Sequence, residues 1–457
     1  MACALTRSPR ACFRSVGPGR GQAAGGAYFV LNGLVASVRG ARKTRGDAEG
    51  VGSLRAIDSD APKSVLRQIP GRAGQFRPAD FAVWRDNVRR GSLAHLADFV
   101  ATRCLPQLER TGIDVAADVL TPFVDGGKCL RSTFMYLGWL CGADDAALCQ
   151  TGADDAALCQ TDADDAALCQ TGADDAALRA SAALELLHAF ALLQDDVMDD
   201  SGLRRGRPAA HLQFGQWHRD RGLSGSSSRF GASLAILLGD LCLVWAEQMM
   251  RESGVPHEAL VRAWPHYDAM RVELAVGQFA DVANDAGARP SLDAVLDVAR
   301  RKSGNYTVRR PLEIGAVMAD RADLIDVLSG YGTAVGEAFQ LRDDILGVFG
   351  SPAVTGKPVG GDLTERKATS VIVAAHRMAE PDVRRQIAEL MAADELDESD
   401  IDLWRTLIRG SGAVDWIEGL IAERLSVALD YLDDDRLGDW VQSALADMAV
   451  VCTERMT

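Results

Sequence analysis

Apolar residues recur at three- and four-residue steps through much of the second half of the chain. Ala189, Leu192, Leu193 and Val197 form one such stripe, which predicts a helix with this face turned to a core. Between residues 181 and 450 the chain is rich in Ala, Leu, Glu and Arg, and we find no sustained apolar-polar alternation of the kind that strands require. The pattern therefore predicts an all-α fold.

Two pairs of aspartates interrupt these apolar stretches. Asp195-Asp196 lies within AFALLQDDVMDDSG, and Asp343-Asp344 lies within GEAFQLRDDILGVFG. A buried carboxylate without a partner is costly and adjacent carboxylates repel, so each pair calls for a cation. The alternative is two solvated acidic patches, because the chain has 64 Asp and Glu residues. One pair alone would favour that alternative, whereas two pairs in matched surroundings favour a metal site.

Helical spacing gathers further ligands around both pairs. Asp199 lies one turn after Asp195, and residues 340, 343, 344 and 347 share one face of the second helix. Basic residues follow each pair, namely Arg204, Arg205, Arg207, Lys357 and Lys367. Magnesium takes oxygen ligands and is usually held by a few carboxylates together with substrate phosphates. The sequence thus predicts a magnesium-bridged polyphosphate site.

Several segments, in order, resemble the trans-isoprenyl diphosphate synthases, also called polyprenyl synthetases. The matching segments and residues are GGKCLRSTF, His188, DDVMD, Arg204-Arg205-Gly206, Gly239-Asp240, Gly277-Gln278 with Asp281, Lys302 with Tyr306-Thr307, Gln340, and GKPVGGDLTERKAT. They cover roughly residues 80 to 450. The resemblance implies an isoprenoid-synthase-type helical bundle around a deep central cavity, formed by one domain over residues 76–457. It also suggests a homodimer.

The reaction that this resemblance implies is the magnesium-dependent, head-to-tail condensation of isopentenyl diphosphate with an allylic diphosphate. The implied metal ligands are Asp195, Asp196, Asp199, Asp343 and Asp344. The implied allylic diphosphate ligands are Arg204, Lys302, Lys357 and Lys367, and those for isopentenyl diphosphate are Lys128, Arg131, His188 and Arg205. Thr307 and Gln340 would lie near the allylic cation, and catalysis would depend on them together with Asp195, Asp196 and Lys302. Taken alone, His188 is more typical of a core histidine, and Lys302 is more typical of a surface lysine.

Two positions depart from the family pattern. Gly347 stands where the second motif often has its last aspartate, and Arg366 precedes Lys367 where glycine is favoured. We interpret Gly347 as a variant motif. Weaker metal binding and a non-catalytic subunit are the alternatives.

Product length depends, in this family, on residues four and five positions before the first motif. These are Ala191 and Phe190, and a single phenylalanine at the more distant position resembles the geranylgeranyl-type short-chain synthases. A twenty-carbon product is therefore our hypothesis, with a farnesyl or longer product, or a catalytically weak regulatory subunit, as alternatives. Phe190 as ordinary core packing is nearly as well supported. A class I terpene cyclase is disfavoured, because Asn284-Asp285 lacks the serine and glutamate of that motif.

Composition limits the classes of protein, the partners and the compartment that fit this chain. The 457 residues are 47% hydrophobic and 25% charged, as in soluble globular proteins, and a net charge of −15 disfavours nucleic-acid binding. The apolar stretch GASLAILLGDLCLVWAEQMM contains Asp240 and Glu247, which predicts a buried helix rather than a membrane span. Ten cysteines without a CxxC pair predict free thiols in a reducing, cytoplasmic compartment.

Two segments stand apart from the predicted domain. The decapeptide GADDAALCQT is repeated over residues 142–178, which we interpret as a tandem expansion of a surface connection between two core helices. Residues 1–75 form a basic, glycine-rich arm with eight Lys or Arg and no acidic residue before Asp47. An organelle transit peptide, a disordered extension and an upstream start codon are the alternatives for this arm. Its glycines favour disorder.

Overall fold

The computed structural model describes residues 78–143, 172–286, 290–350, 360–393 and 395–454. Within these ranges the chain is almost entirely helical, and its strands are limited to one two-residue hairpin. The predicted all-α fold is thus confirmed. The N-terminal arm over residues 1–75 and the repeat units over residues 144–171 lie outside the described residues.

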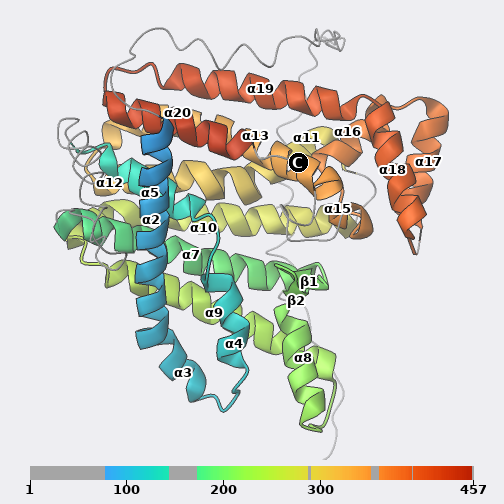
Figure 1. Ribbon diagram of the computed structural model, residues 1–457, viewed down its shortest axis with the longest axis horizontal. Helices are drawn as coiled ribbons and strands as arrows, with labels where there is room; N and C mark the ends of the chain where they lie inside the picture. The colour runs from blue at the N-terminus through green and yellow to red at the C-terminus, as the bar shows by residue number, and fades with distance from the viewer. Residues whose placement is uncertain (1–77, 144–171, 287–289, 351–359, 394, 455–457) are drawn as a thin grey trace, which may run out of the picture. The chain divides into compact units, whose positions relative to one another are not determined.

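The first half of the described chain builds one side of the helical bundle (Figure 1). Its elements are α2 (Pro78–Phe99), η2 (Val100–Cys104), α3 (Leu105–Glu109), α4 (Ala116–Val124), α5 (Leu130–Leu140), α7 (Gly172–Met198), β1 (Leu203–Arg204), β2 (Arg207–Pro208), α8 (Ala210–Asp220), α9 (Ser227–Arg251) and α10 (His257–Ala286). The helix α7 is buried along most of its length, packs on α9, α5 and α2, and belongs to the first core cluster.

The second half is arranged around a second long helix, α13. The elements are α11 (Leu292–Val298), η3 (Ala299–Arg309), α12 (Arg310–Met318), η4 (Ala322–Leu324), α13 (Ile325–Phe349), α15 (Gly361–Thr364), α16 (Ser370–Met378), α17 (Pro381–Ala392), α18 (Glu398–Gly410), α19 (Ala413–Tyr431) and α20 (Asp439–Thr453). α13 packs on η3, α19, α20 and α12. Figure 1 shows α19 running along α13. Both aspartate pairs lie near the C-terminal ends of their helices, α7 and α13.

The segment η3 is a π-helix that crosses α13 closely. A Cβ atom placed on Gly304 would lie 2.8 Å from the backbone carbon of Gly336, so neither position tolerates a side chain without a shift of the backbone. Glycine at both positions lets the two backbones approach each other. This contact brings the polar residues of η3 next to those of α13.

The repeat array ends inside the core rather than on the surface. Its fourth copy, from Gly172, forms the first turns of α7, where Ala177 and Leu178 are buried. Asp174 accepts a hydrogen bond from Trp139 Nε1 at 3.0 Å, which joins the start of α7 to the end of α5. Acidic residues at a helix N-terminus are also stabilised by the helix dipole. The prediction of a surface connection is therefore wrong for residues 172–178.

Among the described residues, two helices are apolar and long enough to span a membrane by length and composition alone. They are Ala173–Met198 of α7 and α9, and the structure buries 72% and 39% of their most apolar windows. The predicted buried helix at GASLAILLGDLCLVWAEQMM is thus a helix, but it is buried along one side only. Its outer side exposes Leu237 and Val244, each at 56%.

Candidate active site

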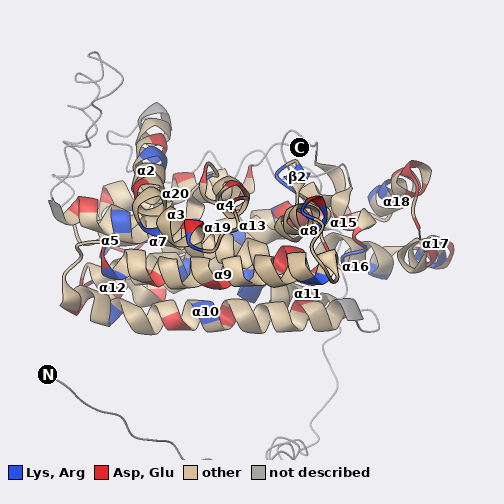
Figure 2. Ribbon diagram, turned by 90° about the horizontal axis from the view of Figure 1, so that it is seen from below, with Lys and Arg blue, Asp and Glu red and all other residues tan. Residues whose placement is uncertain are grey.

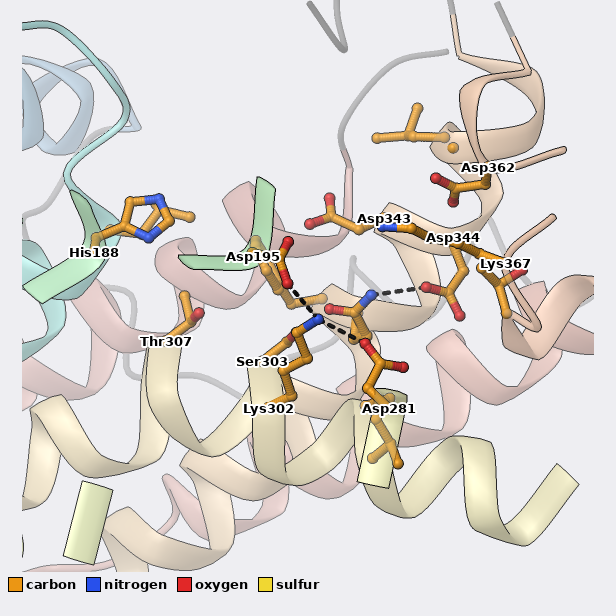
Figure 3. Close-up of a pocket in the computed structure, with 18 of the residues that line it drawn as sticks. His188, Asp195, Asp281, Lys302, Ser303, Thr307, Asp343, Asp344, Asp362 and Lys367 are labelled. Carbon is orange, nitrogen blue, oxygen red and sulfur yellow. Dashed lines mark hydrogen bonds and ion pairs between the residues drawn. The ribbon is translucent and has the colours of Figure 1, made fainter. Parts of the chain in front are cut away.

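A cavity of about 580 Å³ lies between the ends of α7 and α13, with η3 forming a third wall. Charged side chains of both signs line it (Figure 3). The acids are Glu185, Asp195, Asp281, Asp343, Asp344 and Asp362, and the bases are Lys128, Arg131, Arg205, Lys302 and Lys367. The two aspartate motifs, about 150 residues apart in sequence, therefore meet in one cavity as predicted.

Lysines hold the carboxylates of the first motif. Lys302 Nζ donates to Asp195 Oδ1 at 2.8 Å and to Asp281 Oδ2 at 2.6 Å, and Lys367 Nζ donates to Asp199 Oδ2 at 2.6 Å. Burial alone would raise the pKa of Asp195, but the charges of Lys302 and Lys367 outweigh it and lower that pKa. For Lys302, burial acts to lower the pKa, and the two aspartates more than compensate, so the pKa is raised. Both partners are therefore charged at neutral pH.

The hairpin β1–β2 directs two neighbouring arginines in different directions. Arg205 and Gly206 form its turn, with φ of 51° and 74°, and Leu203 pairs with Pro208. Arg204 turns back to α7, where its Nε donates to Asp196 Oδ1 at 2.9 Å. Arg205 instead faces the cavity, and its Nη1 donates to the carbonyl of Pro122 at 2.6 Å. Asp196 is fully buried against Arg204, and neither of these two side chains lines the cavity.

The basic side of the cavity surrounds His188. Burial, followed by the charges of Arg131 and Arg205, lowers the pKa of His188 well below its ordinary value, so the imidazole is neutral at physiological pH. Arg131 stacks over the ring of Tyr306 at 4.4 Å from its centroid. Within the described residues, Arg131 Nε and His188 Nδ1 are buried without a hydrogen-bond partner. Such groups next to a cavity suit an anionic ligand.

The π-helical form of η3 places two predicted residues in the same cavity. Lys302 and Thr307 are five positions apart, and an α-helix of 3.6 residues per turn would point them in different directions. Hydrogen bonding from i to i+5 aligns them instead, and both line the cavity. Thr307 Oγ1 is buried and has no hydrogen-bond partner among the described residues.

Asp344 of the second motif is bound by protein donors. Its Oδ1 accepts from Gln340 Nε2 at 2.7 Å, and its Oδ2 accepts from the backbone N and the Oγ of Ser370 at 3.0 and 2.6 Å. Burial, opposed by these hydrogen bonds, raises the pKa of Asp344 to about 6. This side chain ties α13 to the start of α16. Its predicted role as a metal ligand stays a prediction.

The remaining predicted residues differ in where the structure places them. Asp199 contacts Lys367 of the cavity wall, whereas Phe190 and Ala191 are partly buried and pack against the first core cluster. Lys357 lies outside the described residues. Arg366 has a φ of 54°, so the position at which the family favours glycine does have the left-handed backbone that glycine adopts easily.

Sequence reasoning missed one acid of the cavity wall, Glu185, and named two others, Asp281 and Asp362, without a role. Glu185 was detectable, because it precedes His188 by three positions and shares its helix face. Its Oε1 accepts a hydrogen bond from Ser132 Oγ at 2.8 Å. Asp281 and Asp362 lie in the segments that match the family, but the sequence alone assigned no role to them, because their contacts are with residues distant in sequence.

The comparisons with known proteins agree with this geometry. The family model described as Polyprenyl synthetase matches residues 116–407. The chain belongs to the polyprenyl synthetase family. Among the relatives of this synthetase, a geranylgeranyl diphosphate synthase from Mycobacterium tuberculosis is 34% identical over 256 residues, which are 56% of this chain and 68% of the relative. A geranylfarnesyl diphosphate synthase from Aeropyrum pernix is 34% identical over 243 residues, or 52% of this chain and 70% of the relative.

Solved structures show the same fold as this polyprenyl synthetase. A crystal structure of a geranylgeranyl pyrophosphate synthase from Corynebacterium glutamicum, complexed with isoprenyl diphosphate and magnesium, superimposes with a TM-score of 0.71 at 32% identity. The match covers 81% of this chain and 99% of the other. The helical-bundle fold implied by the sequence is thus confirmed.

Proposed function

We propose that this polyprenyl synthetase is a magnesium-dependent prenyltransferase that condenses isopentenyl diphosphate, head to tail, with an allylic diphosphate. The observation that carries the proposal is the meeting of both aspartate motifs with Lys302 and Lys367 in one cavity. The product that we propose is a short-chain prenyl diphosphate, with geranylgeranyl diphosphate favoured by the single aromatic residue at Phe190.

The donor set fits a divalent cation. Asp195 and Asp199 offer carboxylate oxygens one turn apart, and lysine ammonium groups already stand in as cations beside them. When bound, magnesium would supply Lewis-acid stabilisation of the charge that develops on the departing pyrophosphate. Asp195, Asp199 and Asp343 would hold it, which matches the oxygen ligands that magnesium prefers.

The other residues of the cavity have separate proposed roles in binding the two substrates and stabilising the allylic cation. Lys302 and Lys367 would bind the diphosphate of the allylic substrate and neutralise its charge. Lys128, Arg131 and Arg205 would bind the second diphosphate, that of isopentenyl diphosphate, beside the neutral His188. Thr307 Oγ1 and Gln340 would offer neutral dipoles to the allylic cation, near which a fixed positive charge would be unfavourable.

The decisive experiment is a product assay. Purified protein, magnesium and labelled isopentenyl diphosphate are incubated with dimethylallyl, geranyl or farnesyl diphosphate in turn, and chain length is read by chromatography. We expect a prenyl diphosphate product that disappears with chelator and in Asp195→Ala. Folded, metal-replete protein that yields no product with any starter would contradict the proposal and favour a partner-dependent subunit.

We further propose that the enzyme is a homodimer, with α9 and α10 at the contact between two copies. α10 exposes Val272, Val276 and Phe279 to 61%, 44% and 81%, at positions three and four apart on one side of the helix. α9 adds Leu237 and Val244 on its outer side. Several large apolar side chains exposed together are typical of an association surface. Basic and acidic residues are interspersed along the described helices (Figure 2), which does not favour a nucleic acid as the partner.

A further inference from the structure

The position at which the second motif lacks its last carboxylate lies against another aspartate. A Cβ atom placed on Gly347 would overlap the Oδ2 and Cγ atoms of Asp362 and would lie 3.0 Å from its Oδ1. The carboxylate of Asp362 therefore occupies the space in which an aspartate side chain at position 347 would begin. Glycine is required at position 347 as long as Asp362 is placed there.

Asp362 belongs to the same cavity as the two motifs. It lines the cavity together with Asp343, Gly347 and Lys367, and Figure 3 shows it beside the second motif. Asp344, in contrast, directs its oxygens to Gln340 and Ser370. The acids that line this side of the cavity are thus Asp343 and Asp344 of α13 and Asp362 of α15.

The backbone around Asp362 is well anchored. Gly360 precedes the short helix α15 with a φ of 72°, and Leu363 is fully buried in the third core cluster. The backbone oxygen of Asp362 also accepts a hydrogen bond from the backbone N of Lys367 at 2.9 Å. These contacts hold the backbone of Asp362 at the wall of the cavity.

We propose that Asp362 supplies the carboxylate that Gly347 lacks, so that a divalent cation on this side of the cavity is bound by Asp343 of α13 and Asp362 of α15. This assignment rests on the metal-dependent function proposed above. Magnesium usually takes one or two protein carboxylates and keeps several waters, so the pair is sufficient. The third carboxylate of the second motif then comes from position 362 instead of position 347, and Gly347 does not weaken metal binding.

The test is isothermal titration of magnesium chloride into the protein with inorganic pyrophosphate present. Asp362→Asn keeps the size of the side chain and removes its charge, and we expect magnesium affinity to fall at least about tenfold. Gly347→Ala should act in the same direction, because its methyl group displaces the carboxylate. Asp382→Asn, on the exposed helix α17, is the matched control and should bind like the wild type.

A pair of double variants separates charge from packing. Gly347→Asp/Asp362→Ala returns the carboxylate to α13 and should recover magnesium affinity to within about threefold of the wild type, a loss of at most ~0.7 kcal/mol. Gly347→Ala/Asp362→Ala has the same backbone changes without a carboxylate and should remain weak. Equal affinities of the two double variants would overturn the proposal. Circular dichroism and Tm establish that each variant is folded.

Asp195→Asn distinguishes this proposal from the one on which it rests. If Asp195→Asn loses magnesium affinity while Asp362→Asn binds like the wild type, the role of Asp362 is refuted and the metal-dependent function stands. If magnesium binds equally well in both variants, the metal site itself is refuted.

Discussion

Lysine side chains occupy cation positions in the cavity of this synthetase. Lys302 lies between Asp195 and Asp281, and Lys367 lies beside Asp199, all within 2.8 Å. Asp281 is not part of either motif, and its contact with Lys302 does not depend on Asp195. We therefore expect Asp281 to position Lys302 rather than to contact the substrate.

The first prediction concerns Asp281→Asn. The side chain keeps its size but no longer fixes the ammonium group of Lys302, so kcat/KM for the allylic diphosphate should fall about 10- to 100-fold. KM for isopentenyl diphosphate should hardly change, because that substrate is assigned to the opposite side of the cavity. Steady-state kinetics with each substrate varied in turn would measure this. Asp268→Asn on the same helix, whose side chain is 61% exposed and pairs with Arg271, is the control, and an equal loss there would contradict the prediction.

Glu313 is the centre of a buried ionic network behind η3. Its Oε1 accepts from Arg309 Nε at 2.7 Å and from Ser329 Oγ at 2.6 Å, and its Oε2 accepts from Arg310 Nη1 at 2.6 Å. His266 Nδ1 lies 3.1 Å from the same Oε2. Burial would raise the pKa of Glu313, but these hydrogen bonds and charges outweigh it and lower the pKa to about 2.

The second prediction follows from this network. Glu313→Gln leaves Arg309 and Arg310 without their buried partner, and should lower the free energy of unfolding at pH 7 by about 3–5 kcal/mol. Because the folded pKa is depressed, the stabilisation by Glu313 is complete above its unfolded pKa of about 4.5 and is lost as the pH falls toward 2. The difference between wild type and variant should therefore narrow between pH 5 and pH 3.5 in urea unfolding. The prediction would be contradicted if the difference in unfolding free energy did not change with pH. It would also be contradicted if Glu258→Gln, at an exposed position, lost as much stability as Glu313→Gln.

The sequence predicted those site residues that act together with residues only a few positions away in the chain. Asp195 and Asp199 are one helical turn apart, and helical periodicity alone places them on one face. The contact between Gly347 and Asp362 could not be predicted in this way, because it joins two elements, α13 and α15, through tertiary packing. The ion pair of Asp281 with Lys302 has the same origin in tertiary packing.

At the scale of elements, η3 shows where periodicity fails. The rule of 3.6 residues per turn predicted helices correctly, yet it assigns Lys302 and Thr307 to different faces. The π-helical form brings both into the cavity, and the glycine contact of η3 with α13 fixes it there. A local change of helix type leaves no periodic signal, so only the family resemblance pointed to this pair.

The third prediction concerns the start of α7. Deleting residues 142–171 joins Cys141 to Gly172, and the new junction still reads Cys-Gly-Ala-Asp-Asp. Trp139 and Asp174 would then be five positions apart, within the reach of the chain, so the hydrogen bond between them can persist. We expect kcat/KM within about twofold of the wild type, since the change is remote from the cavity. Deleting residues 142–178, which also removes Asp174 and Leu178, is the control and should lower Tm strongly; a dead variant lacking 142–171 would refute the prediction.

The fourth prediction concerns product length and α7. Phe190 packs against the first core cluster, five positions before Asp195. If its ring closes the floor of the space for the growing chain, Phe190→Ala should shift the main product beyond twenty carbons, as measured by chromatography. Phe190→Leu, which keeps most of the volume, should retain the wild-type product. An unchanged product in Phe190→Ala, from a folded and active enzyme, would show that Phe190 serves core packing alone.

At the scale of the whole molecule, three core clusters divide the described helices. The first surrounds α7, the second joins α2, α5 and α13 to α20, and the third packs α16 to α19 on the C-terminal end of α13. The cavity lies where the first and third groups meet, which is why both motifs end there. Composition and periodicity sufficed to predict an all-α fold, but the grouping of helices depends on packing between distant segments, which no single stretch of sequence encodes.

The fifth prediction concerns association of two copies. Phe279→Glu places a charge at the most exposed large apolar side chain of α10, and should weaken the proposed dimer by at least about 2 kcal/mol, or roughly thirtyfold in Kd. Light scattering after size-exclusion chromatography at micromolar concentration should then report monomers. Leu403→Glu, on the separate helix α18, is the control and should stay dimeric. A wild-type chain that is monomeric, or a Phe279→Glu variant that remains dimeric, would refute this surface.

The fourth repeat copy gives the core helix α7 its first turns, and this has a consequence for the gene. A tract of near-identical units gains or loses members when DNA replication slips, and each unit of ten residues keeps the reading frame. Whatever the number of copies, the last one would still place the same Asp-Asp turn beside Trp139. Alleles of different length are therefore expected to encode the same active site, so selection on catalysis would not hold the number of units constant.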